Sequence, residues 1–271
     1  MTGVAYTSVD GLDVTLDGST LRLRLDRPDK RNAISEVMLV GLVDAMTRAS
    51  TDERVRVIVL DGAGDHFCGG ADIVARNAGD GPKPSAGSIQ RRVPTQAHRL
   101  IPLVRTVQVP VVCRVQGWAA GIGFQLALAA DFCVAANDAR FWEPFTKRGF
   151  TPDSGGTWLL PRLVGVARAK ELLMLGRELS GAEAAEWGLI YRAAERDDVD
   201  QAADDVVAQL AAGPTVALGL TKWLVHRGTA RVFDEHLADE GFAMELSSRA
   251  EDFREGISAM AEKRDPRFTG R

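Results

Sequence analysis

The sequence lacks the features that mark membrane, secreted and zinc-dependent proteins. It has no run of about 18 uninterrupted apolar residues, and residues 1–11 do not follow the basic-then-apolar order of an export signal. Cysteine is scarce: Cys68, Cys113 and Cys133 are far apart and form no CxxC pair, which argues against a disulfide framework or a structural zinc site. We therefore expect a cytoplasmic protein with reduced, packing cysteines and no membrane partner.

Common catalytic motifs are missing as well. The chain has no GxSxG turn, no HExxH helix and no GxxxxGK[ST] loop, which argues against the common serine hydrolases, zinc peptidases and P-loop enzymes. With 33 Lys and Arg against 37 Asp and Glu, the net charge of −4 gives no reason to expect a nucleic-acid partner. The histidines lack metal-ligand spacing, so we predict no metal site and expect surface or packing roles for them. They are His66, His98, His226 and His236.

The first part of the chain alternates strand and helix patterns, as expected of an α/β protein. A length of 271 residues with 45% hydrophobic content is ample for one large core. Residues 14–16 and 21–25 alternate apolar and polar side chains around a turn, which predicts a hairpin, and Ser35 can cap a following helix. The later elements predicted here are strands over 55–60, 111–115 and 132–135 and a helix over 121–130.

The second part of the chain is mostly helical in pattern. Before it, residues 77–94 gather Gly, Pro, Ser and Lys, which predicts a loop or lid instead of a strand or helix. Because no linker is long enough to separate independent domains, we predict an α/β core over residues 1–195 and a helical region over 196–271. Helical patterns cover 166–175, 181–187, 199–212 and 233–248, and only 189–192 looks extended.

Two glycine-rich turns each follow a predicted buried strand. One begins at Gly62 and contains FCGGADI at residues 67–73. The other reads GWAAGIG over residues 117–123. Backbone amides at a helix start can stabilise an anion without supplying a proton, so two converging turns could form an oxyanion hole. The alternative is that the glycines only permit tight turns. A dinucleotide site is not supported, because Leu126 occupies the third glycine position after Gly121 and Gly123.

A third segment, RGFTPDSGGTWLLPRLVG at residues 148–165, places an acid among small residues. Asp153 can cap the turn through nearby backbone amides, or it can act as a general base whose pKa is tuned by partial burial. Glu143 is the nearest other acid in the sequence, and the adjacent Pro144 favours a turn or surface role for it.

Taken in order, these segments resemble the enoyl-CoA hydratase/isomerase (crotonase) superfamily. The matching motifs are RPDKRNAIS, FCGGADI, VQGWAAGIG, TPDSGGTWLLPR and the closing EKRDPRFTGR. The resemblance implies an α/β fold, a crotonase-like spiral of repeated strand-strand-helix units with a helical C-terminal trimerisation region. It also implies a CoA thioester substrate in fatty-acid-type metabolism, no cofactor apart from the CoA of that substrate, and a homotrimer or dimer of trimers.

The same resemblance assigns roles to particular residues. The two oxyanion amides would be those of Ala71 and Ile122, and Ile122 stands where Gly is common, so its side chain is expected to narrow the acyl pocket. Asp72, together with Asp131, also has a structural interpretation as a cap beside the glycine turns. The residues expected along the CoA moiety are Lys30, Arg31, Ala33, Gly70, Asp72, Ile73, Val74 and Lys263.

The acids depart from the pattern of hydratases. Gln125 and Phe145 stand where typical hydratases carry the two glutamates that hold water, so Gln125 can only orient a polar group and Phe145 forms pocket wall. Asp153 falls where some isomerases keep a proton-shuttling acid. Similarity to the phenylacetate-pathway isomerases, which act on 1,2-epoxyphenylacetyl-CoA or 3-enoyl-CoA, therefore predicts an isomerase that uses Asp153.

Three other interpretations stay open at this point. The chain could be a hydratase with a non-standard acid, or an acyl-CoA-binding protein without activity. It could also be an aryl acyl-CoA dehalogenase with Asp153 as the nucleophile, because the position of His98 upstream of Pro110 is similar to that of the dehalogenase histidine.

Overall fold

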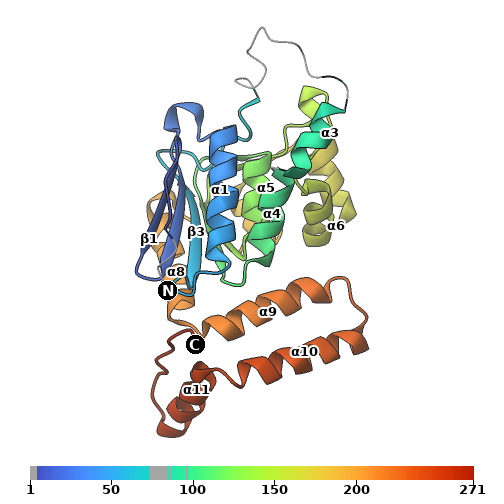
Figure 1. Ribbon diagram of the computed structural model, residues 1–271. Helices are drawn as coiled ribbons and strands as arrows, with labels where there is room; N and C mark the ends of the chain where they lie inside the picture. The colour runs from blue at the N-terminus through green and yellow to red at the C-terminus, as the bar shows by residue number, and fades with distance from the viewer. Residues whose placement is uncertain (1–4, 74–84, 86, 96) are drawn as a thin grey trace.

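The computed structural model describes residues 5–73, 85, 87–95 and 97–271 as an α/β core with helices beneath it (Figure 1). The main sheet has six strands in the order β1-β2-β3-β4-β6-β9, and all neighbours are parallel except β1 and β2. Its strands are β1 (Leu12–Asp17), β2 (Thr20–Leu25), β3 (Val57–Gly62), β4 (Val111–Val115), β6 (Phe132–Ala136) and β9 (Arg192–Ala194).

A smaller sheet lies beside the main one and was not predicted. It has the order β5-β7-β8 and consists of β5 (Trp118–Ala120), β7 (Arg140–Trp142) and β8 (Glu178–Ser180). Each of these strands has only three residues, which is too short for an alternating pattern to be recognised. The α/β class that the sequence predicts is nevertheless present in these two sheets and their helices.

Helices cover both faces of the main sheet. On one face lie α1 (Glu36–Ala49), α4 (Ala97–Thr106) and α5 (Ile122–Ala129), and on the other lies α8 (Val199–Ala212). Ser35 caps α1 as predicted, since its hydroxyl accepts a hydrogen bond from the Met38 amide at 3.2 Å. Because both faces are covered, β3 is buried along its whole length, which explains the apolar run over residues 57–60.

The remaining helical elements connect these layers. Two expectations need correction: residues 88–95 form helical turns where a loop was predicted, and the extended segment lies at 192–194 instead of 189–192. Residues 77–84 and 86 of the same predicted loop lie outside the described residues. The elements are η1 (Pro28–Lys30), α3 (Ser88–Arg92), η2 (Val93–Thr95), η3 (Thr146–Arg148), α6 (Gly156–Leu175, kinked at Gly165), α7 (Gly181–Glu186) and η4 (Arg196–Asp198).

A helical hairpin leaves the core below the sheet (Figure 1). It consists of α9 (Thr215–Gly228) and α10 (Phe233–Ser247), and α11 (Glu251–Glu262) follows. Because α8 packs on the sheet, the part that leaves the core begins with α9 and not at residue 196. Several large apolar side chains of this region are exposed, as expected of an association surface, while the trimer stays a prediction. They include Val225, Phe233, Phe242, Met244, Ile257 and Met260.

A buried ion-pair cluster stabilises the centre of the sheet. Asp61, at the end of β3, is fully buried and accepts hydrogen bonds from Arg24 at 2.9 and 3.0 Å and from Arg114 at 2.9 Å, and it also pairs with Arg22. Burial acts to raise the pKa of Asp61, but the hydrogen bond from Arg24 and the charges of Arg114 and Arg22 outweigh it and hold the pKa below its usual value. The carboxylate therefore stays charged inside the fold.

The cysteines are buried and unpaired, as expected of packing residues. Burial raises the pKa of the Cys68 thiol to about 12, so this sulfur is a poor nucleophile at neutral pH. No helix in the described part of the chain is long and apolar enough to cross a membrane.

Candidate active site

The two glycine-rich turns converge, and main-chain hydrogen bonds hold them together. The Cys68 amide donates to the Trp118 carbonyl at 2.7 Å, and the Ala120 amide donates to the Cys68 carbonyl at 2.9 Å. Gly123 makes this approach sterically feasible, because a Cβ at that position would lie 2.6 Å from the Cβ of Cys68. The start of α5 is therefore fixed against the FCGGADI turn.

Each turn presents one amide that is not used by the fold. Ala71 pairs with Ile34 as in a parallel ladder: the Ile34 amide donates to the Gly70 carbonyl at 2.8 Å, and the Asp72 amide donates to the Ile34 carbonyl at 3.0 Å. The Ala71 amide points away from this ladder and finds no acceptor among the described residues. Ile122 is the first residue of α5, so its amide has no acceptor within the helix.

Both of these residues line one cavity of about 90 Å³. Asp153 is the only carboxylate among the described residues of its wall. The structure thus brings together residues that are far apart in the sequence and that the motifs singled out separately. The predicted site residues that line the cavity are Gly70, Ala71, Ile73, Ile122, Phe145 and Asp153.

Asp153 is held by the tight turn that precedes α6. The Ser154 hydroxyl donates to Asp153 Oδ1 at 3.0 Å, and the Gly156 amide donates to the Asp153 carbonyl at 3.3 Å. Ser154 has a φ of 53° and Gly155 a φ of 95°, so the backbone turns sharply through the left-handed region. This turn gives the carboxylate an orientation that a regular helix or strand would not supply.

Most of the wall around Asp153 is apolar, with Arg148 and Ser154 as the other polar side chains. Phe145 is 6% exposed and packs edge-on against Phe150, with ring centroids 5.4 Å apart. Ile122 also contributes its branched side chain to the wall. Neither Phe145 nor Ile122 can bind a catalytic water through a charged group.

Sequence reasoning missed a buried acid behind the cavity, whereas Asp153, for which partial burial was expected, is exposed. Glu143 is fully buried, which corrects the expected surface role, and the Gln125 side-chain amide donates to its two oxygens at 3.2 and 3.3 Å. Burial raises the pKa of Glu143 well above its usual value, the hydrogen bond from Gln125 opposes this, and the charge of Asp153 adds to it. Gln125 thus orients Glu143 and is not part of the cavity wall. Because Glu143 follows the three-residue strand β7, no alternating pattern in the sequence marked its side chain as buried.

The predicted CoA-binding segment is an ordered loop beside the cavity. Lys30 and Arg31 are exposed, and the Arg31 carbonyl accepts a hydrogen bond from the Gly69 amide at 2.7 Å. Buried Asn32 holds the loop, because its side chain bonds the Arg27 amide at 2.8 Å and the carbonyls of Ala63 and His66. Two exposed cations are thus positioned next to the wall residues Gly69 and Gly70.

Four further predicted residues are not among the described residues that line the cavity. Ala33 follows this loop, and its carbonyl accepts from the Arg27 guanidinium at 2.7 Å. Asp72 is paired with Arg27 at 3.0 Å, which fits its structural interpretation. Val74 lies outside the described residues. Lys263 ends α11, which lies below the α9–α10 hairpin at the opposite end of the molecule from α3, so one chain does not bring Lys263 to the cavity.

His98 does not support the dehalogenase interpretation. It lies on α4 and is exposed, and it is not among the described residues of the cavity wall. A hydrolytic base would have to reach a water molecule next to Asp153. Of the described residues of α4, only Ala97, the residue before His98, lines the cavity.

Comparison with known proteins agrees with this fold. The family described as enoyl-CoA hydratase/isomerase matches residues 16–271. The 1,2-epoxyphenylacetyl-CoA isomerase of Escherichia coli K12 is 38% identical over 94% of this chain and 97% of its own length. The carnitinyl-CoA dehydratase of Salmonella enteritidis PT4 is 34% identical over 97% of this chain and 99% of its own.

A solved structure has the same architecture. The enoyl-CoA hydratase of Bacillus anthracis superposes with a TM-score of 0.89 and 31% identity, covering 96% of this chain and all of that one (100%). The matches extend over the core and over the helical region that follows it. This chain therefore belongs to the enoyl-CoA hydratase/isomerase family.

Proposed function

We propose that this protein is an enoyl-CoA isomerase that moves the double bond of a 3-enoyl-CoA into conjugation with the thioester. The observation that carries the proposal is that Asp153, as the only described carboxylate of the cavity wall, shares the cavity with the Ala71 and Ile122 amides. An isomerase needs one group that moves a proton, whereas typical hydratases of this family use two glutamates to hold water.

In the proposed mechanism the thioester oxygen lies between the Ala71 and Ile122 amides. These donors bind the enolate more strongly than the neutral carbonyl, which lowers the barrier to removing the C2 proton. Losing one such donor costs about 2.7 to 4 kcal/mol in other enzymes. Asp153 takes the C2 proton, and the electron pair of the C2–H bond passes into a dienolate. When Asp153 returns the proton at C4, the C3–C4 π pair forms the new C4–H bond and the pair released at C2 becomes the C2–C3 double bond.

The relatives support an acyl-CoA substrate but divide on the reaction. The E. coli relative is named an isomerase, whereas the Salmonella relative is named a dehydratase. Glu143 does not provide the missing acid of a hydratase, because it is buried behind the cavity and burial raises its pKa. The cavity wall thus favours an isomerase over a hydratase.

The test uses the purified protein with 3-enoyl-CoA, 2-enoyl-CoA and 1,2-epoxyphenylacetyl-CoA in D₂O. We expect the 3-enoyl substrate to give the conjugated 2-enoyl product, with deuterium at C4 to the extent that Asp153 exchanges its proton with solvent. Water addition to the 2-enoyl substrate should be slow. Faster hydration than isomerisation would refute the proposal, and binding of all three substrates without turnover would make the protein a binder.

Replacing Asp153 tests its role directly. Asp153→Asn should lower kcat by about 10² to 10⁴ fold with little change in affinity, because general acid/base catalysis contributes on that order. Ser154→Ala is the matched neighbour: it removes the 3.0 Å hydrogen bond that orients the carboxylate and should reduce kcat far less. Unchanged isomerisation by Asp153→Asn would contradict the assignment.

A further inference from the structure

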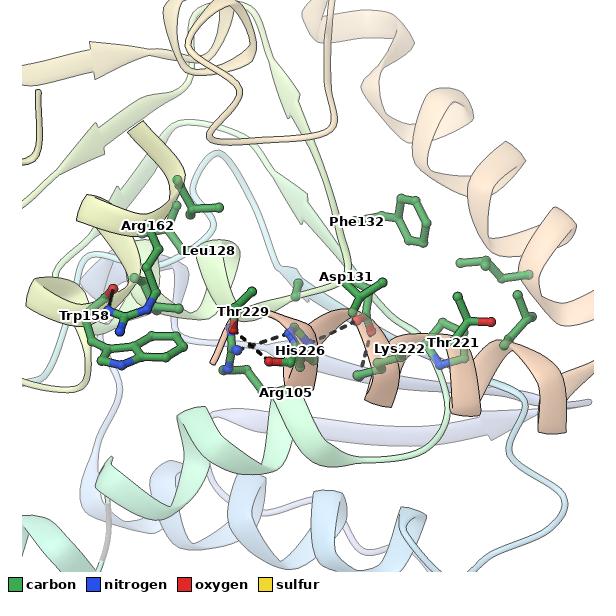
Figure 2. Close-up of a pocket in the computed structure, with 17 residues that line it drawn as sticks. Arg105, Leu128, Asp131, Phe132, Trp158, Arg162, Thr221, Lys222, His226 and Thr229 are labelled. Carbon is green, nitrogen blue, oxygen red and sulfur yellow. Dashed lines mark hydrogen bonds and ion pairs between the residues drawn. The ribbon is translucent and has the colours of Figure 1, made fainter. Parts of the chain in front are cut away.

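A second cavity lies between the core and α9, apart from the candidate active site (Figure 2). It has a volume of about 410 Å³ and shares no lining residue with the cavity of Asp153. Its wall is mainly apolar and includes Leu128 from α5, Leu159 from α6 and Val225 from α9. This size and lining are typical of pockets that hold small organic ligands.

Two arginines in this wall have no anionic partner. The guanidinium groups of Arg105 and Arg162 lie 4.7 and 4.0 Å from the ring centroid of Trp158. Among the described residues neither has a carboxylate within ion-pair distance, although the charge of Asp131 in the same wall acts on Arg105. Arg105 instead contacts His226 Nδ1 at 3.1 Å, and Arg162 donates to the Trp158 carbonyl at 3.1 Å. Stacking on an aromatic ring orients a guanidinium group without neutralising its charge.

His226 adds an unpaired donor. Arginine can only donate hydrogen bonds, so His226 Nδ1 must accept from Arg105 and the ring proton must lie on Nε2. Burial, with the charges of Arg105 and Lys222, lowers the pKa of His226 to about 4, so the ring is neutral at pH 7. Nε2 is buried without a hydrogen-bond partner in the described structure, and its nearest carboxylate oxygen, on Asp131, is 3.9 Å away.

The other charged residues of the wall neutralise each other. Lys222 Nζ lies 2.7 Å from Asp131 Oδ2 and also donates to the carbonyls of Val104 and Val109. Burial raises the pKa of Asp131 and lowers that of Lys222, so whichever group holds the shared proton, the pair has no net charge. The two unpaired guanidinium groups therefore set the charge of the cavity (Figure 2).

We propose that this cavity binds a small carboxylate with an apolar body, of the kind represented by a medium-chain fatty acid or an aryl-alkanoic acid. The apolar body occupies the space between Leu128, Leu159 and Val225. The carboxylate meets the guanidinium groups of Arg105 and Arg162. Arginine is suited to this role because its planar fork matches the two oxygens of a carboxylate. This inference does not depend on the reaction proposed for Asp153.

The test is isothermal titration of the full-length protein with octanoate and, as an uncharged analogue, octanamide. Octanoate should bind in the wild type, and octanamide should bind at least about tenfold more weakly, because a hydrogen bond to a charged group contributes about 1.5 to 3 kcal/mol. Arg105→Met and Arg162→Met each keep most of the apolar stem and should weaken octanoate binding to a similar extent. Raising the salt concentration should weaken it as well.

Arg168→Met provides the matched control. Arg168 lies on the same helix as Arg162 and also stacks on a tryptophan, 4.4 Å from the ring centroid of Trp187, but it does not line the cavity. This variant should bind octanoate like the wild type. Similar thermal unfolding of Arg168→Met and Arg162→Met would show that Arg162→Met loses octanoate binding without losing its fold.

Three results would overturn the proposal. Equal binding of octanoate and octanamide would remove the role of the two charges. Unchanged octanoate binding by Arg105→Met and Arg162→Met, with competition by an acyl-CoA, would place the ligand in the Asp153 cavity instead. If octanoate does not bind and Arg162→Met changes the sedimentation coefficient, the guanidinium groups serve contacts between subunits.

Discussion

The unfolding free energy of Glu143→Gln, measured relative to that of the wild type, should increase as the pH rises. Burial raises the pKa of Glu143 well above its usual value, and a single neutral hydrogen-bond partner, Gln125, does not compensate for this. The folded protein therefore binds a proton at this site at pH values where the unfolded chain has released it. A raised pKa of this kind contributes stability that is fully present below the unfolded pKa and is lost as the pH rises toward the folded pKa.

The magnitude follows from the linkage relation. Above about pH 4.5, where an unfolded glutamate loses its proton, wild type should lose about 1.4 kcal/mol of unfolding free energy per pH unit relative to Glu143→Gln, until the folded pKa is reached. The glutamine keeps the shape and the hydrogen-bonding capacity of a neutral carboxylic acid. It removes only the group that titrates.

Urea unfolding at several pH values between 5 and 8 provides the assay. The difference in unfolding free energy between Glu143→Gln and wild type should grow steadily with pH. Glu186→Gln is the control for removing a carboxylate, because Glu186 is exposed at the end of α7. A difference that is independent of pH would show that Glu143 is charged in the folded protein and would refute the reasoning.

Three further substitutions probe other features of the structure. Asp61→Asn should cost about 3 to 5 kcal/mol in urea unfolding at pH 7, because it leaves the arginine cluster without its buried counter-charge. Since the folded pKa of Asp61 is lowered, this cost should disappear as the pH falls below about 4, and a cost that persists in acid would contradict it. Gly123→Ala places a Cβ 2.6 Å from Cys68 and should lower kcat at least about tenfold by separating the two turns, so near-normal turnover would show that the turns tolerate the shift. Ile122→Ala keeps the amide but widens the cavity, so kcat/KM should rise for branched or aryl acyl-CoA relative to short unbranched ones, and an unchanged ratio would contradict the narrowing role of Ile122.

The sequence predicted elements well where the buried face is apolar. The strand β4 and the helix α8 have the bounds that their patterns predict, because Val112 on one and Val206 on the other meet in one apolar cluster. In contrast, α9 was missed. Its buried positions are Thr215, Gly219 and Lys222, which follow helical spacing but carry no apolar pattern. Lys222 is buried because Asp131 and two carbonyl groups accept its protons, and these partners are distant in the sequence.

The candidate site shows the same division. The motifs identified Ala71, Ile122 and Asp153, and the structure places them in one cavity. The role of Gln125 could not be predicted, because its partner Glu143, just after β7 of the small sheet, is 18 positions away. The pairing of these two side chains depends on how β7 packs against α5, and a local sequence pattern carries no information about that contact.

The two amides at Ala71 and Ile122 are fixed by the backbone, and this has a consequence for how new activities could arise in this scaffold. A point mutation at either position, other than to proline, changes the side chain but leaves the N–H in place. The two donors that we propose for stabilising an enolate would thus survive most substitutions, while the neighbouring acids and the apolar lining remain free to vary. A different reaction could therefore be designed by keeping the two amides and moving a carboxylate to another position on the cavity wall. The turn that carries Asp153 is one such position.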